Sequence, residues 1–585
     1  MTSSVAPSIV SEPAATAIRP RLRARWVFRA APDSDAVRML AEELHLPPVV
    51  CRLLLARDHG TTASAKKFLR PRLEQLHEPS GLLGLDRAVG RLVRAVRSGE
   101  TILVHGDYDV DGICSTTLLI RAIGAFGGRA VPFIPRRIED GYDLSVAGVD
   151  AAVAAGAKVV ITADCGTSAH APIAMLCEQG IDVIVTDHHL PGGPLPDCLA
   201  VINPQQPGCT YPDKGLAAVG VAFKLALALA RALGANENIV LHMLDLVALA
   251  TIADVAPLCG ENRVLARYGL KLLRETQNPG LRALIRASGL EGKELTAGRI
   301  GFILAPRLNA VGRLGHALRG VELLMTTSEH EANVIARELE ELNRRRQALD
   351  RATLDEAREM VAALDLDETW GIVLAKEGWH PGVIGIVASR IVEDTGRPTV
   401  LIALDAGMGK GSGRSISAFH LHEALTDCRQ HLVRFGGHRM AAGVTVSSEH
   451  VGEFARCFNE IARARLRAED LVPELRVDLE LPIDDANVGL EALLRHFEPF
   501  GIGNAAPVFV ARGVRLASPP RVIGQDGLKL RLATAAGQLE AVGWGMGWLA
   551  ATLDMSMPID VAFRLESEEW NGENRLQAKL ADVHW

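Results

Sequence analysis

Short apolar runs alternate with segments of helical length between Thr101 and His189. The runs TILV, AVPFIP, KVVIT and IDVIVT have the length of buried strands, and stretches such as CSTTLLIRAIGAFG separate them. Strands and helices that alternate in units of about 30 residues are typical of a parallel, doubly wound sheet. We therefore predict an α/β region with a parallel sheet in this part of the chain.

The pattern changes three times after that region. Residues 215–290 carry apolar positions at helical spacing, and residues 328–364 read as one long, highly charged helix without Gly or Pro that bridges two domains. WGIVLA and TVLIAL then predict strands of a second α/β region. From about Val472, short β-like runs separated by turn residues predict a small all-β barrel or sandwich.

Composition limits the classes of function. The chain has 585 residues, 48% apolar and 23% charged, and a net charge of −7, so no global basic charge points to nucleic acid. Nine scattered cysteines without a CxxC pair are typical of reduced thiols in a cytoplasmic protein. The first 24 residues read as a disordered leader, and no apolar run is long enough to predict a membrane span.

Acidic and histidine residues follow three of the predicted parallel strands. His105, Asp107, Asp109 and Asp111 follow TILV, Asp164 ends VVITAD, and the DHH triplet 187–189 ends VIVTDHH. Ligands of open α/β sheets bind at the carboxyl ends of the strands, so these side chains are expected to meet at one edge. A fourth motif, ALATIADVAPL, places Asp254 at the end of an apolar helix.

A set of carboxylate and imidazole ligands without thiolates favours Mn²⁺ or Mg²⁺ as the bound metal. A two-metal site suits phosphoryl displacement. So many carboxylates at one place would repel one another unless cations lay between them. Asp107 stays open at this point, as a helix N-cap or a contact behind the metal ligands.

These motifs resemble the DHH phosphoesterase superfamily. GDYDVDG, TADCGTS, TDHH and TIADVAPL are similar to its four motifs, and FGGHRMAAG resembles the GGH motif of the DHH-associated domain. EGWHPGVIGIVASR and FEPFGIGNAAPVF resemble the RecJ family in particular, bacterial exonucleases specific for single-stranded DNA. The resemblance covers the chain from about Arg25 to its end.

The resemblance implies a division of the chain and a set of metal ligands. We expect a leader (1–24), a DHH catalytic domain with N-terminal helices (25–325), a connecting helix (326–365), a DHH-associated substrate-binding domain (366–466) and a C-terminal OB-like domain that binds nucleic acid (467–585). One metal would be held by His105, Asp109 and Asp164, and the other by Asp111, Asp164, His188 and Asp254. His189 would contact the scissile phosphate.

Further residues are candidates for binding the phosphates of the substrate. They are Asn309 and Arg313 in NAVGRLG, Ser412 and Arg414 in KGSGRS, and Gly436, Gly437 and His438 in the GGH motif. Trp379 and His380, which precede a predicted helix, are weaker candidates for contacts with DNA.

The C-terminal region is acidic overall, with 11 Lys and Arg against 18 Asp and Glu in residues 466–585. Its residues 512–531 nevertheless hold five basic side chains: Arg512, Arg515, Arg521, Lys529 and Arg531. This strip suits a groove that guides a strand, and equally an ordinary solvated hairpin.

The resemblance implies a metal-dependent exonuclease that degrades single-stranded DNA from 5′ to 3′ into 5′-mononucleotides, in repair and recombination. The alternatives are a DHH phosphodiesterase for short oligonucleotides or cyclic dinucleotides, and a DNA-binding scaffold on an inactive core. The scaffold would have lost metal carboxylates that this chain keeps. We expect a cytoplasmic monomer that binds single-stranded DNA but no membrane. A single-stranded-DNA-binding protein and a helicase are further candidate partners.

Overall fold

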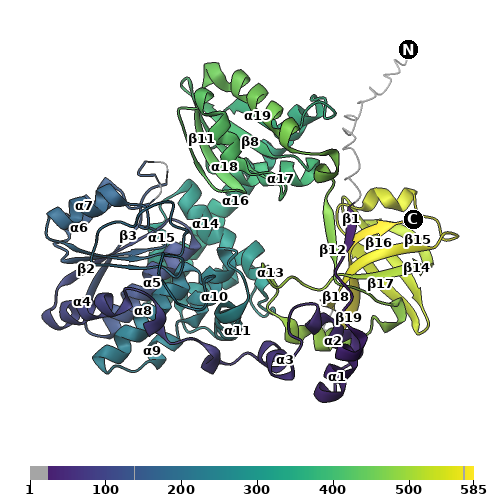
Figure 1. The fold of residues 1–585 in the computed structure, drawn as a ribbon, viewed down its shortest axis with the longest axis horizontal. Helices are drawn as coiled ribbons and strands as arrows, with labels where there is room; N and C mark the ends of the chain where they lie inside the picture. The colour runs from purple at the N-terminus through teal and green to yellow at the C-terminus, as the bar shows by residue number, and fades with distance from the viewer. Residues whose placement is uncertain (1–23, 138, 142, 571–572) are drawn as a thin grey trace, which may run out of the picture.

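The computed structural model of this protein describes residues 24–137, 139–141, 143–570 and 573–585, so the expected leader lies outside the described residues except for Ala24. Figure 1 shows two α/β regions and a β-rich C-terminal region. No described helix is both long and apolar enough to cross a membrane.

The first α/β region is built on a five-stranded parallel sheet, as the alternating pattern predicts. Its strands, in spatial order, are β3 (Arg129–Phe133), β2 (Thr101–Gly106), β4 (Val159–Ala163), β5 (Asp182–Thr186) and β6 (Ala200–Ile202). All side chains of β4 are buried, because helices cover both faces of the sheet.

Two cores lie on opposite faces of this sheet. Val104 of β2 packs with one set of helices, and its neighbour Leu103 packs with the other, because successive strand residues point to opposite faces. The first set is α4 (Leu85–Ser98), α5 (Val110–Ala125), α8 (Ala218–Leu233), α10 (Leu244–Ala253) and α11 (Gly260–Arg274). The second set is α6 (Val146–Ala154) and α7 (His170–Glu178).

Smaller helices complete this region and lead into the connecting helix. They are α9 (Asn238–Leu241), α12 (Pro279–Ala287), α13 (Ala297–Arg299), the π-helical turn η3 (Ile300–Leu304), α14 (Ala305–Leu314) and α15 (Leu318–Met325). The connecting helix is α16 (Glu329–Ala362), whose N-cap Ser328 accepts a hydrogen bond from the amide of Glu331.

Helix α16 joins the two α/β regions by packing on both. Ile335 and Leu339 in its first half belong to the core of the first region, and Leu354 and Ala357 belong to a core of the second. Its 34 residues span about 51 Å at 1.5 Å per residue. The helix is thus a bridge, as its sequence predicts, and one of its faces is buried from Ala332 to Ala357.

The second α/β region holds a five-stranded mixed sheet. Its spatial order is β10 (Arg434–Gly437), β11 (Ala441–Ser447), β9 (Met408–Arg414), β8 (Thr399–Asp405) and β7 (Ile372–Glu377), and its helices are α17 (Ile384–Thr395), α18 (Leu421–Asp427) and α19 (Val451–Arg465). Only β7 and β8 run parallel to each other.

The C-terminal region holds a seven-stranded, mainly antiparallel sheet, in agreement with the predicted OB-like fold. Its spatial order is β13 (Leu479–Glu480), β14 (Phe509–Val514), β18 (Ile559–Trp570), β19 (Glu573–His584), β17 (Gly537–Gly543), β16 (Gly527–Thr534) and β15 (Leu516–Ile523). The short helix α20 (Val488–Leu494) packs against it.

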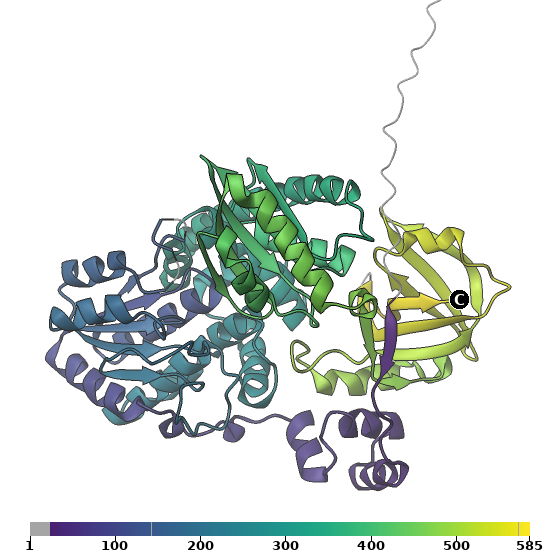
Figure 2. The ribbon, with the colours of Figure 1, turned by 45° about the horizontal axis from the view of Figure 1, so that its top comes forward.

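The N-terminal helices lie with the C-terminal region and not with the catalytic region, where we expected them. Strand β1 (Arg25–Phe28) pairs in parallel with β12 (Glu474–Val477). Helices α1 (Ser34–Leu44), α2 (Pro48–Leu55) and α3 (Thr62–Leu69) share one apolar core with the C-terminal sheet. Figures 1 and 2 both show this purple N-terminal segment beside the yellow strands. A helical pattern predicts which face of a helix is buried, but it does not predict which part of the protein packs against that face.

Arg263 of α11 links the first α/β region to this combined unit. Its side chain is buried and donates hydrogen bonds to the carbonyl oxygens of Phe497 (2.7 Å), His496 (3.1 Å) and Phe68. The guanidinium also lies 4.1 Å from the centre of the Phe68 ring. Burial lowers the pKa of Arg263 to about 9, which leaves the group charged at neutral pH.

We predict that Arg263→Met destabilises this junction, because three buried carbonyl groups lose their donor. The expected loss is about 2–4 kcal/mol in the free energy of unfolding. Urea denaturation followed by tryptophan fluorescence measures it. Arg274→Ala, which removes an exposed ion pair with Glu294, is the control and should cost under about 1 kcal/mol. Equal midpoints for the two variants would contradict the role of Arg263.

Candidate metal centre

The loop after β2 carries three aspartates in a tight turn. β2 ends at Gly106, and α5 begins at Val110 with Asp109 as its N-cap. The Asp109 carboxylate accepts hydrogen bonds from the amides of Asp111 (2.9 Å) and Gly112 (3.1 Å). A side chain at Gly112 would collide with the backbone of Asp107, so only glycine allows this turn. The N-cap that we considered for Asp107 is therefore formed by Asp109.

Three other segments bring acidic groups and imidazoles to the same edge. Asp164 directly follows β4 and has a φ of +70°, a strained conformation for a non-glycine residue that is typical of functional sites. Asp187 follows β5 and accepts from the amides of His188 (2.7 Å) and Thr167 (3.0 Å). Asp254 is the C-cap of α10.

The side chains form three overlapping groups whose ligand atoms lie within 4.8 Å of one another. The groups are Asp107, Asp109 and Asp164; Asp111, His188 and Asp254; and Asp164, His188 and His189. The Nε2 atom of His188 lies 3.2 Å from Asp164 Oδ1 and 3.7 Å from Asp254 Oδ2. Asp164 and His188 each belong to two groups, so the geometry favours Asp164 as the shared ligand of two cations.

Burial and mutual repulsion raise the pKa values of these carboxyls. Burial is the largest cause for each, followed by neighbouring carboxylates. The pKa of Asp111 rises to about 7 and that of Asp254 to about 9, and those of Asp107 and Asp164 also rise. Positive charge between the carboxylates would reverse these shifts.

Several buried atoms at this edge have no hydrogen-bond partner within the described residues. They include Asp107 Oδ1, Asp164 Oδ1, His188 Nε2 and the Nε2 atom of the expected ligand His105. Such atoms are costly unless something binds them. The pKa of His188 is lowered to about 4 by burial and by His189, so its imidazole is neutral and able to bind a metal. Carboxylates with one imidazole fit Mn²⁺ or Mg²⁺.

His189 is held by Asp187 at the rim of the groups. Its Nδ1 lies 2.8 Å from Asp187 Oδ1. Although burial lowers its pKa, the hydrogen bond and charge of Asp187 outweigh this and raise the pKa to about 9. A protonated His189 is suited to an anionic phosphate, the contact that the resemblance implies.

His105 does not join these groups, although it was the expected first ligand. Its ring is fully buried toward α6, with Nδ1 3.6 Å from Cys165 Sγ. A Cβ atom at Gly148 would lie 2.8 Å from His105 Nε2. His105 points to the same face of the sheet as Leu103, two residues earlier, whereas the turn after Gly106 directs Asp107 to the site. Among the described residues, Asp107 rather than His105 shares a group with Asp109 and Asp164.

A basic cavity of about 340 Å³ lies beside Tyr108 of the first acidic loop. It is lined by Arg136, Arg137, Glu139, Gly312, Arg313, Leu314, Gly315, His316 and His380. Tyr108 belongs to the first acidic loop, and the guanidinium of Arg137 lies 4.7 Å from the centre of its ring. Sequence reasoning missed Arg136 and Arg137. The available signal was that they follow β3, another parallel strand that ends at this edge.

Of the seven expected phosphate ligands, Arg313 lines this cavity, and Arg414 lies close enough to it to affect its charge. Burial and the neighbouring Arg137, Arg346 and Arg414 lower the pKa of Arg313 to about 10, and Arg313 donates to the carbonyl of Gly382. Arg414 donates to Ser412 Oγ (3.2 Å) on β9. Asn309 plays a different part, because its Oδ1 accepts from the amide of Val110 and so holds the acidic loop.

Two other expectations fare differently. Gly436, Gly437 and His438 lie at the exposed β10–β11 hairpin, and none of them lines the basic cavity. Trp379 is only 6% exposed, and its indole donates to Glu356 of α16. That ring is part of a core and is not available to stack on a base. His380 lines the basic cavity instead.

The basic strip of the C-terminal region is partly neutralised. Arg512 is paired with Glu480 and Asp560, and Lys529 with Glu540. Arg515, Arg521 and Arg531 are exposed, the last two on the β15–β16 hairpin. The strip is therefore smaller in effective charge than its sequence indicates.

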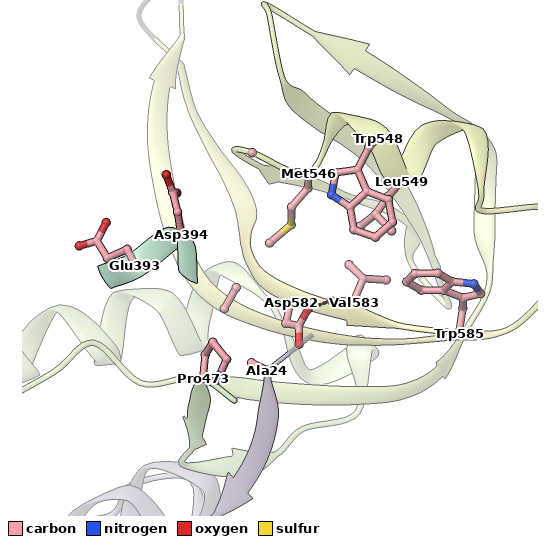
Figure 3. A pocket seen from close by; sticks show the side chains of 12 residues that line it. Ala24, Glu393, Asp394, Pro473, Met546, Trp548, Leu549, Asp582, Val583 and Trp585 are labelled. Atoms are coloured by element: carbon pink, nitrogen blue, oxygen red, sulfur yellow. Dashed lines mark hydrogen bonds between the residues drawn. The ribbon is translucent and has the colours of Figure 1, made fainter. Parts of the chain in front are cut away.

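A second cavity, of about 300 Å³, lies between α17 and the C-terminal region (Figure 3). Glu393 and Asp394 line one side, and Met546, Trp548 and Trp585 line the other. It shares no residue with the carboxylate groups, so the metal chemistry belongs to the first site.

Three family models match successive parts of the chain. The N-terminal domain of the DHH family matches residues 101–251, the DHHA1 domain matches residues 368–464, and the RecJ OB domain matches residues 477–582. The single-stranded-DNA-specific exonuclease RecJ of Bacillus subtilis is 39% identical over 562 residues, which cover 96% of this chain and 70% of that protein.

Solved structures agree with these matches. RecJ from Thermus thermophilus in complex with Mn²⁺ has a TM-score of 0.82 at 35% identity, covering 96% of this chain and 80% of that one. The same protein in complex with Mg²⁺ has a TM-score of 0.77 at 33% identity, covering 96% and 79%. The acidic motifs, the three domain matches and this likeness over almost the whole chain agree: the chain belongs to the RecJ family of DHH proteins.

Proposed function

We propose that this chain hydrolyses single-stranded DNA from its 5′ end into 5′-mononucleotides, with two divalent cations, Mn²⁺ or Mg²⁺. The observation that carries the proposal is the overlap of the carboxylate groups at Asp164 and His188, beside a basic cavity. Cations bound in such a pair of sites supply an activated water and neutralise charge on the scissile phosphate.

The residues divide into ligands and positioning groups. Asp107, Asp109 and Asp164 would hold one cation, and Asp111, Asp164, His188 and Asp254 the other. His189, fixed by Asp187, would donate a hydrogen bond to the phosphate being cleaved. Asn309 would keep the acidic loop in place through Val110.

The end of the strand would be recognised in the basic cavity. Arg137 and Arg313 face a space of limited volume next to Tyr108 and Asp109, which suits a terminal phosphate better than a continuous chain. A strand whose 5′-phosphate lies there would present its first internucleotide bond to the carboxylates. We propose repair and recombination as the setting, and a single-stranded-DNA-binding protein and a helicase as candidate partners.

We expect Asp164→Ala to lower the rate of hydrolysis by about 10³-fold or more, because both cations lose a ligand. Much of the binding to DNA should survive, since the arginines are unchanged. Release of nucleotides from end-labelled single strands with Mn²⁺ measures this, and Asp150→Ala, an exposed position on α6, is the control. Near-normal activity of the purified Asp164→Ala protein would refute the shared-ligand role. If the wild-type chain cleaves a dinucleotide but does not cleave longer strands, the result would favour the short-oligonucleotide phosphodiesterase.

We also expect a pH-dependent stability in the presence of chelator. The folded protein keeps protons on Asp111 and Asp254 at pH values where the unfolded chain, with pKa values of about 4, has lost them. The folded state then binds more protons, so this contribution to the free energy of unfolding falls as pH rises from about 4 to about 9.

Asp254→Asn should reduce that fall, and Mn²⁺ should reduce it in the wild type. Thermal melts across this pH range, with chelator and with Mn²⁺, measure both effects. The same pH profile for the variant and the wild type in chelator would contradict the raised pKa of Asp254.

Arg313→Ala should raise KM for 5′-phosphorylated strands by about 10- to 100-fold, because a charged hydrogen bond to the terminal phosphate is lost. KM for strands with a 5′-hydroxyl should change far less. Arg313→Lys keeps the charge, so its KM for 5′-phosphorylated strands should lie between those of the wild type and Arg313→Ala. Arg38→Ala on α1 is the exposed control. Equal effects on both kinds of strand would place the phosphate elsewhere.

A further inference from the structure

The turn that begins at Asp164 holds its backbone in two unusual conformations. Asp164 has a φ of +70° and Gly166 a φ of +106°, both in the left-handed region. Glycine takes up such a conformation freely, whereas aspartate does so at a cost in strain. A Cβ atom at Gly166 would also lie 2.7 Å from Thr162 Oγ1, so a larger residue does not fit there. Contacts from outside the turn must therefore hold Asp164 in place.

Two hydrogen bonds anchor this turn on either side of Gly166. Thr162 Oγ1 of β4 donates to the carbonyl of Cys165 (2.7 Å). The amide of Thr167 donates to Asp187 Oδ2 (3.0 Å). These partners belong to β4 and to the residue after β5, so they are part of the sheet edge itself. The amide of Gly166, at the centre of the turn, takes its partner from a different segment.

Asp143 supplies that partner from the segment between β3 and α6. Its Oδ1 accepts from the amide of Gly166 (2.7 Å) and from that of Leu144 (2.9 Å). A carboxylate that accepts from backbone amides forms stronger hydrogen bonds than a neutral group does. Asp143 belongs to none of the groups of possible metal ligands in the described part of the chain. Its contact with the metal centre therefore runs through Gly166.

Backbone strain is concentrated around this contact. Asp143 itself has a φ of +77°, and Val255, which follows Asp254, has a φ of +62°. Three of the six described non-glycine residues with positive φ thus lie in or beside the acidic motifs: Asp143, Asp164 and Val255. Strained residues cluster where function needs a fixed geometry, and they persist only where neighbouring contacts enforce them.

We propose that Asp143 is a positioning residue of the metal centre, which binds the amide of Gly166 and thereby keeps the Asp164 carboxylate directed at both cation sites. This inference rests on the proposed function and adds to it the residue that fixes the shared ligand. Without this hydrogen bond, the peptide between Cys165 and Gly166 is free to rotate, and Asp164 relaxes toward negative φ. Because Asp164 is shared, one loosened turn weakens both cation sites.

Asp143→Gly should weaken the binding of Mn²⁺ about 10- to 100-fold, the usual effect of losing a group that orients a metal ligand. Glycine favours the φ of +77° at this position, so the variant removes the acceptor without adding strain. Asp143→Asn keeps an acceptor oxygen and should bind Mn²⁺ nearly as the wild type does. Isothermal titration calorimetry of the full chain with Mn²⁺ measures these affinities. Asp58→Gly, at an exposed aspartate with a φ of +63°, is the matched control and should match the wild type.

Two further measurements separate positioning from a merely structural role. Electron paramagnetic resonance distinguishes a coupled pair of Mn²⁺ ions from isolated ions, and Asp143→Gly should show less of the coupled signal at equal Mn²⁺ concentration. Its melting temperature in chelator should stay near that of the wild type, because relief of strain at Asp164 offsets the lost hydrogen bond. The rise in melting temperature on adding Mn²⁺ should be smaller, since a ligand stabilises the folded state according to its affinity.

Three results would overturn the proposal. The first is wild-type Mn²⁺ affinity and coupled signal in Asp143→Gly. The second is equal weakening in Asp143→Asn and Asp143→Gly, because asparagine still accepts from Gly166. The third is a lower melting temperature in chelator together with a wild-type rise on adding Mn²⁺, which would make Asp143 an anchor of its own segment and nothing more.

The proposed function fails in a different way. If the wild-type chain binds Mn²⁺ but releases no nucleotides from single strands, the proposed function is wrong, and the binding measurements still decide the role of Asp143. If the wild type hydrolyses single strands and Asp143→Gly binds Mn²⁺ as the wild type does, the proposed function stands and the role of Asp143 is refuted.

Discussion

Buried carboxylates that face one another stay together only if bound protons or cations neutralise their charge. Asp107, Asp111 and Asp164 are each at most 3% exposed, and their pKa values rise through burial and mutual repulsion. The fold nevertheless forces them together, and it holds Asp164 at a φ of +70° to do so. Strain and repulsion of this kind are tolerated where the binding of a cation compensates for them. The edge of the first sheet is therefore the functional centre.

The surroundings of this centre follow from the same constraint. The helical stretch from α13 to α14 runs past it, with Arg313 at one end and Asn309 bound to the acidic loop. The positive charge beside Arg313 suits phosphates. Helix α16 and Arg263 then fix the remaining regions relative to this stretch through buried apolar and polar contacts.

Much of this organisation could be predicted from the sequence, because it depends on local periodicity. The apolar runs of β2, β4 and β5 indicated a parallel sheet, and the carboxyl ends of such strands must lie at one edge. The bridge formed by α16 could also be predicted from the sequence, since 34 residues without Gly or Pro continue a helical pattern. Periodicity does not reveal partners, however, so the N-terminal helices were assigned to the wrong neighbour, and the burial of Trp379 was missed.

By itself, the sequence determined the elements, the edge where the acidic residues meet and the chemistry of their side chains. Only the tertiary structure decided which of them face the same point. His105 and Asp107 are two residues apart in one motif, yet the first points into the core under α6 and the second into the ligand groups. The direction of each side chain depends on the turn after Gly106 and on the packing around it, and neither is encoded by spacing alone.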